Sequence, residues 1–136
     1  MDYKQGDIYF YDPPTKTAAE SESDSSQGAL FVTSGSEQAG LRPYIIMSRE
    51  VVHRNKPTVV GVPLTTRINK ANSYRIKLPS PELIPVPGRE AFMDSVALCD
   101  HVRVLDISRF RYKIGRLSDN AILGVGLGLS YVFDLR

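Results

Sequence analysis

The sequence predicts one small, mainly β domain that ends in a helix, a β-barrel-like fold of the α+β kind. Three observations support this fold class. The chain has 136 residues, which suits a single core. Short apolar stretches of strand length recur along it, separated by proline, glycine and polar residues. The final stretch, beginning at Ser118, has the length and apolar spacing of a helix.

Strands are expected where β-branched, aliphatic and aromatic residues cluster. These stretches are Asp7–Asp12, Pro43–Ser48, Thr58–Leu64, Tyr74–Leu78, Ser95–Asp100, His101–Asp106 and Tyr112–Leu117. Within the fourth stretch apolar and basic side chains alternate, so Arg75 and Lys77 are predicted to point outward. Four prolines in Pro79–Gly88 predict an irregular connection.

Helical structure is expected in three places. Arg49–Lys56 reads as a short helical turn in which His53 is exposed, and Asp106 can cap a turn through Arg109. Ser118 is a good N-cap for a terminal helix. The apolar face of that helix would comprise Ile122, Val125, Leu129, Val132 and Phe133. Three glycines, at 124, 126 and 128, oppose this prediction by about 1 kcal/mol each, but the length and the cap favour the helix.

A polar, acidic and serine-rich segment at residues 15–34 is expected to be a mobile loop within a single domain spanning 1–136. Residues 1–34 carry two basic and six acidic side chains, whereas the rest carries 15 basic and 9 acidic ones. A basic body is compatible with an anionic partner such as nucleic acid, although on charge alone a solvated mixed surface is the better explanation. No apolar run reaches membrane-spanning length, and the lone Cys99 fits a reducing cytoplasm.

The most distinctive stretch is Gly35–Pro43, in which two glycines bracket a carboxylate and an amide, and Arg42 precedes a proline. Proline biases Arg42 towards extended geometry at a junction between loop and strand, where its guanidinium can bind phosphate. A surface hairpin with a weak ion pair is the alternative. The sequence has no metal-ligand cluster, nucleotide-binding phosphate loop or serine-hydrolase elbow.

In order along the chain, several stretches resemble the MazF/PemK toxins, the endoribonuclease half of bacterial toxin–antitoxin pairs. The similar stretches are Gly6–Phe10, Gly35–Pro43, Val62–Thr66, Ser95–Asp100, Val102–Arg109 and Ile114–Ser118. The resemblance covers nearly all of the chain except residues 15–34. It implies an SH3-like barrel of the CcdB/PemK type, a homodimer, neutralisation by a cognate antitoxin, and cleavage of single-stranded RNA without a metal or other cofactor.

The resemblance also implies site residues. The catalytic pair of the family falls on Arg42 and Thr65, and the motif glutamate falls on Glu37. Because a guanidinium stays protonated, Glu37 is the more natural general base and Arg42 the electrostatic catalyst. The candidate RNA contacts are Ser36, Gln38, Thr66, Arg67, Asp100 and His101.

Two departures from the family stand out, namely the long acidic segment at 15–34 and His101, which stands where glutamine is common. The alternatives to a nuclease are a non-catalytic CcdB-like toxin that poisons a protein such as gyrase, and an inactive family member. Since a pure binder has no need of Glu37, Arg42 and Thr65 together, the sequence favours the nuclease.

Overall fold

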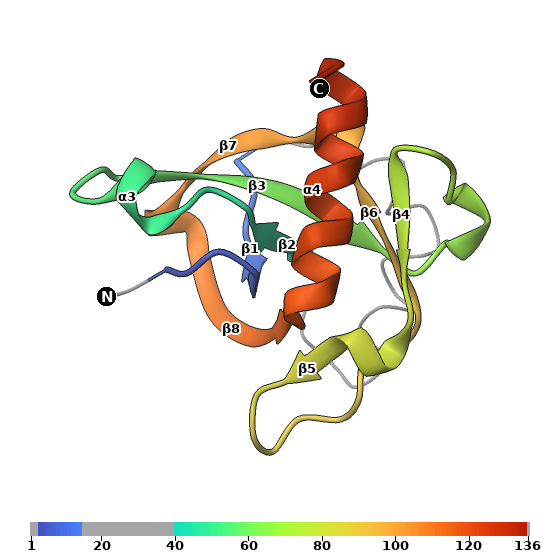
Figure 1. Cartoon of the computed structure of the whole chain (residues 1–136). Coiled ribbons are helices and arrows are strands. Elements are labelled where there is room, and N and C mark those ends of the chain that lie inside the picture. The colour runs from blue at the N-terminus through green and yellow to red at the C-terminus, as the bar shows by residue number, and fades with distance from the viewer. Residues whose placement is uncertain (1–2, 15–39, 136) are drawn as a thin grey trace.

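The computed structural model describes residues 3–14 and 40–135, and it confirms the predicted fold class (Figure 1). Within these ranges, an eight-stranded antiparallel sheet curls into a nearly closed barrel, with helix α4 lying across one face. The strands follow the order β4-β6-β3-β2-β1-β8-β5, and β7 pairs with β3. The bounds are β1 Asp7–Tyr11, β2 Arg42–Ile46, β3 Thr58–Thr65, β4 Arg75–Leu78, β5 Leu83–Pro85, β6 Ser95–Leu98, β7 Arg103–Asp106 and β8 Phe110–Leu117.

Helical structure forms where it was expected, together with three further short turns. The α-helices are α3 Glu50–His53 and α4 Asp119–Phe133, and the 3-10 turns are η1 Ile68–Lys70, η2 Ser80–Glu82, η3 Cys99–His101 and η4 Ile107–Arg109. The predicted caps are both present, because Ser118 accepts a hydrogen bond from the Ala121 N–H at 3.0 Å and Asp106 accepts one from the Ser108 N–H at 2.9 Å.

The two faces of the sheet have different roles because side chains alternate along each strand. The face covered by α4 holds the larger core, which includes Ile8, Phe10, Ile45, Leu64 and Ala97. The opposite face holds a second cluster, built from Tyr9, Tyr11, Tyr44, Ile46, Val59 and Leu105. Helix α4 lies in front of the sheet in Figure 1, so the second face looks away from the viewer.

Helix α4 lies close against the sheet at Gly128. A Cβ at this position would lie 2.7 Å from Cys99 Sγ and 2.8 Å from Ile76 Cγ1, so the glycine permits the close approach of helix and sheet. Ala121 and Val125 are buried on the same side of the helix. Phe133, which was predicted to share this apolar face, is 56% exposed. It lies at the last helical position, where the sheet no longer covers the helix.

Three other expectations were wrong. The proline-rich connection contains β5, which pairs with β8 because Leu83 is buried opposite Leu117. The predicted strand ending at Asp100 stops at Leu98, and η3 turns the chain into β7. His53 is buried rather than exposed, since its ring joins the Ser48 hydroxyl at 3.0 Å to the Tyr3 carbonyl at 2.8 Å. The predicted loop at 15–34 lies outside the residues that the structure describes.

Candidate active site

Strand register brings Arg42 and Thr65 together on the sheet face opposite α4. Strands β2 and β3 pair with Tyr44 opposite Pro63, and continuing this register by two residues places Arg42 opposite Thr65. Directly opposed residues of an antiparallel pair have Cα atoms about 5 Å apart and side chains on the same face. The arginine before the proline and the threonine at the end of the next strand therefore occupy neighbouring positions.

Both side chains are held by backbone contacts. Arg42 Nη1 donates to the Leu41 carbonyl at 2.8 Å, and Thr65 Oγ1 accepts from the Arg67 N–H at 3.2 Å. Because Thr65 uses its oxygen as an acceptor, its own O–H remains suited to donate to an anionic oxygen. Arg42 is 8% exposed and Thr65 is 1% exposed. A phosphate can therefore contact both groups only after their surroundings move.

A second polar cluster lies further along the same sheet, at Arg75, Asp100 and His101. The Arg75 guanidinium binds the Asp100 carboxylate through Nε at 2.9 Å and Nη2 at 2.7 Å. Arg75 Nη2 also lies 3.2 Å from His101 Nε2, which accepts this hydrogen bond in the neutral ring. The two hydrogen bonds from the Arg75 guanidinium fix the orientation of the Asp100 carboxylate. Asp100 and His101, both predicted from sequence, thus form one cluster, whereas Arg75, predicted only to point outward, was not among the candidate RNA contacts.

Cys99, the residue before Asp100, has an unreactive thiol. It is fully buried, and its thiol donates weakly to the Val125 carbonyl at 3.7 Å. Burial, and secondarily the charge of Asp100, raise the pKa of the Cys99 thiol to about 12. A thiol in this state is no nucleophile at neutral pH.

Of the other predicted site residues, the structure describes only Thr66 and Arg67. Thr66 follows β3, and its hydroxyl oxygen is buried without a hydrogen-bond partner in the part of the chain that the structure describes. Such an orphaned polar atom is unusual and suits a ligand. Arg67 lies beside it, just before η1. Ser36, Glu37 and Gln38 fall outside the described residues.

Two basic residues that the sequence did not single out as site residues share the face of Arg42 and Thr65. Arg103 of β7 pairs with Gly61, and its Nη1 lies 3.4 Å from the Tyr44 hydroxyl. Lys77 of β4 pairs with Val96, which in turn pairs with Thr65. Alternation in Tyr74–Leu78 predicted that Lys77 points outward, but sequence alone does not say which strands lie beside β4.

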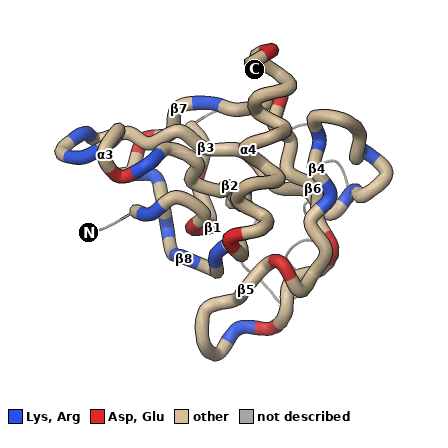
Figure 2. Tube along the Cα trace, viewed as in Figure 1, with Lys and Arg blue, Asp and Glu red and all other residues tan. Residues whose placement is uncertain are grey.

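Within 3–14 and 40–135, no group of three or more His, Cys, Asp or Glu side chains is placed to hold a metal ion. In the same ranges, no helix is long and apolar enough to cross a membrane. Lys and Arg positions, blue in Figure 2, lie on β4, β7 and β8 and in the segments flanking α3, while α4 is uncharged along most of its length. The arrangement supplies cationic and hydroxyl donors for an anionic ligand on the face away from α4.

Known proteins resemble this chain in sequence and in fold. The profile of the PemK-like, MazF-like toxins of type II toxin–antitoxin systems matches residues 4–133. The endoribonuclease MazF of Staphylococcus saprophyticus is 35% identical over 106 residues, which are 74% of this chain and 84% of that protein. The crystal structure of MazF from Deinococcus radiodurans superposes with a TM-score of 0.61 at 20% identity, covering 98% of this chain and 99% of that one. A mycobacterial endoribonuclease in complex with its cognate antitoxin gives 0.56 at 14% identity, covering 98% and 95%.

Proposed function

Because the chain belongs to the PemK-like, MazF-like toxins of type II toxin–antitoxin systems, we propose that it cleaves single-stranded RNA at a preferred short sequence. The observation that carries this proposal is the β2–β3 pairing of Tyr44 with Pro63, which, continued by two residues, would put Arg42 opposite Thr65. A guanidinium and a hydroxyl on one sheet face can hold the non-bridging oxygens of a single phosphate. The fold itself supports no particular chemistry, so the proposed activity depends on these two side chains.

The reaction that suits these residues is attack by the RNA's own 2′-hydroxyl. The 2′-oxygen forms a bond to the adjacent phosphorus, the bond from phosphorus to the 5′-oxygen breaks, and the product strand ends in a 2′,3′-cyclic phosphate. Arg42 stabilises the negative charge of the pentacoordinate phosphorane, and Thr65 holds the phosphate in line. Glu37 takes the proton of the 2′-hydroxyl, and the departing 5′-oxygen takes a proton from the solvent. This route requires neither an activated water molecule nor a metal ion.

The polar cluster at the end of β6 supports a role in base selection. Asp100 and His101 present acceptor and donor atoms at fixed positions because Arg75 holds both of them. Unstacked bases of single-stranded RNA are read by such groups along their exposed edges. We assign the remaining RNA contacts to Ser36, Gln38, Thr66 and Arg67.

The cleavage test uses purified protein, a long single-stranded RNA and a chelator of divalent metals. Wild-type protein is expected to produce discrete fragments with cyclic phosphate ends. Arg42→Ala should abolish them, whereas Arg54→Ala, which removes an exposed arginine just after α3, should not. Intact RNA with folded wild-type protein would favour the alternatives, a CcdB-like poison of a protein such as gyrase or an inactive family member, and a pull-down would separate these two.

The assignment of the base has its own test. Glu37→Gln should lower the cleavage rate and remove the rise in rate with pH that a carboxylate base produces. If Glu37→Gln cleaved normally across the pH range while Arg42→Ala did not, another group would be the base.

The partners follow from the same family membership. We propose that a cognate antitoxin protein neutralises this chain and that the active form is a homodimer. Sedimentation of the purified chain tests the dimer. The antitoxin is tested by adding the product of a neighbouring antitoxin gene, which should abolish RNA cleavage.

A further inference from the structure

A row of side chains crosses four neighbouring strands on the face that carries the candidate site. Lys77 of β4 lies opposite Val96 of β6, and Val96 lies opposite Thr65 of β3. The β2–β3 register, continued two residues beyond the Tyr44–Pro63 pair, extends the row to Arg42. The direction of Lys77 is fixed independently, because its neighbour Ile76 packs against Gly124 and Gly128 of α4. Lys77 must therefore point to the opposite face, where Arg42 and Thr65 lie.

The spacing in this row suits a chain of phosphates. Neighbouring strands are about 4.8 Å apart, so the backbone at Lys77 lies about 10 Å from Thr65 along the row. A lysine side chain reaches across part of this distance while its ammonium stays in solvent. Lys77 is thus too far away to touch the phosphate held by Arg42 and Thr65, but it is well placed for a neighbouring one.

The charges along β4 are not equivalent. Arg75 is committed to Asp100 through two hydrogen bonds and is mostly buried. Lys77 is exposed and forms no ion pair with any residue between 3 and 14 or 40 and 135. Asp94, just before β6, is engaged with the Ser80 N–H at 2.8 Å. An uncompensated ammonium beside a phosphate-binding pair can attract an anion without first breaking an internal ion pair.

We propose that Lys77 binds the RNA backbone at a phosphate next to the scissile one and so sets the path of the strand across β3, β6 and β4. This inference rests on the proposed function for the identity of the ligand. Lys77 acts as a positioning residue, because it contacts the substrate's backbone but none of the reacting atoms. The bound strand then runs from Arg42 towards the cluster of Arg75, Asp100 and His101, where its bases are read.

The test measures how binding depends on salt. A fluorescent single-stranded DNA oligonucleotide of the RNA's sequence serves as the probe, because it carries the phosphates but lacks the attacking hydroxyl. Each phosphate contact to a single strand contributes about 0.7 to the slope of log K against log salt concentration. Lys77→Gln should weaken binding and lower the slope by about 0.7, while Lys77→Arg should preserve it.

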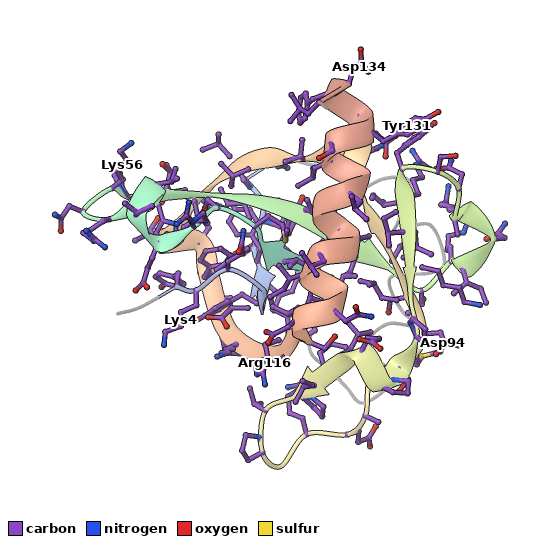
Figure 3. All side chains as sticks on the ribbon, viewed as in Figure 1. Lys4, Lys56, Asp94, Arg116, Tyr131 and Asp134 are labelled. Atoms are coloured by element: carbon purple, nitrogen blue, oxygen red, sulfur yellow. The ribbon has the colours of Figure 1, made fainter. Side chains whose placement is uncertain are left out.

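Lys56→Gln is the matched control, since it removes the same charge at the tip of the turn after α3, far from β4 (Figure 3). It should leave the slope unchanged. On cleavable RNA, Lys77→Gln should raise KM with kcat retained, as expected for a backbone contact made equally in the ground and transition states. Circular dichroism and the urea midpoint verify that each variant is folded.

An unchanged slope for Lys77→Gln, or the same decrease for Lys56→Gln, would overturn the inference, and so would a decrease in kcat with KM unchanged. The two proposals fail separately. If wild-type protein cleaves RNA but the Lys77→Gln slope is unchanged, only the positioning role is lost. If it binds the oligonucleotide through Lys77 without cleaving RNA, the nuclease proposal is lost and the backbone contact stands.

Discussion

The contact of α4 with η3 can be tested by giving Gly128 a methyl group. In Gly128→Ala the new Cβ would lie 2.7 Å from Cys99 Sγ and 2.8 Å from Ile76 Cγ1, both shorter than carbon atoms tolerate. In Gly126→Ala, two residues away in the same helix, the new methyl would meet nothing within 4 Å. Comparing the stabilities of these two variants therefore separates the effect of helix propensity from the effect of packing.

The expected magnitudes follow from these two environments. Replacing glycine by alanine within a helix stabilises the folded state by about 1 kcal/mol, and this is the whole expected effect at residue 126. At residue 128 the same gain is opposed by overpacking, which typically costs about 1–3 kcal/mol. The two variants should thus differ by about 1–3 kcal/mol, with Gly128→Ala the less stable.

Urea unfolding measures this difference, provided that the m-values of the two variants agree. Combining Gly128→Ala with Cys99→Ala, which removes the sulfur, should recover part of the loss as a coupling energy. The clash also acts on η3, so Gly128→Ala should reduce cleavage even well below its unfolding temperature. Equal midpoints for the two alanine variants would show that α4 does not lie as close to the sheet as described.

Four further predictions concern single side chains. Cys99, with its pKa raised to about 12, should react with a thiol–disulfide reagent at pH 8 only as the protein unfolds in urea; fast labelling of native protein would contradict its burial. The pKa of Asp106 is lowered, first by the Ser108 N–H and then by the Ser108 hydroxyl. Its stabilising effect is therefore complete above the carboxyl's unfolded pKa and is lost as pH falls through the lower folded value, and Asp106→Asn should flatten that part of the stability–pH curve. His53→Ala removes the hydrogen bonds of the buried ring to the Ser48 hydroxyl and the Tyr3 carbonyl and should cost about 1–3 kcal/mol in unfolding free energy, whereas a loss near zero would contradict these contacts. His101→Gln should change the sequences at which a long RNA is cut; an identical profile would remove His101 from base selection.

Local sequence patterns predicted the elements whose signals are contained in a few residues. Alternation identified β4, the Ser118 cap identified the start of α4, and Asp106 identified η4, because each depends on neighbouring groups. The prediction that His53 is exposed failed because the residues next to it do not indicate its contacts with Ser48 and Tyr3. Tyr3 is 50 residues away in the sequence. β5 was missed because prolines are poor strand formers, although they are tolerated at the edge of a sheet, where this strand lies.

The candidate site likewise has some features with a local sequence signal and others that depend on distant contacts. The proline after Arg42 predicted an extended arginine suited to phosphate, because backbone preference and side-chain chemistry are properties of single residues, whereas Thr65 was indicated by the family resemblance. Their placement on one face, with Lys77 in the same row, was decided only by strand register. Register depends on which distant strands pair, and that pairing is set by burying two whole faces of the sheet rather than by any local signal.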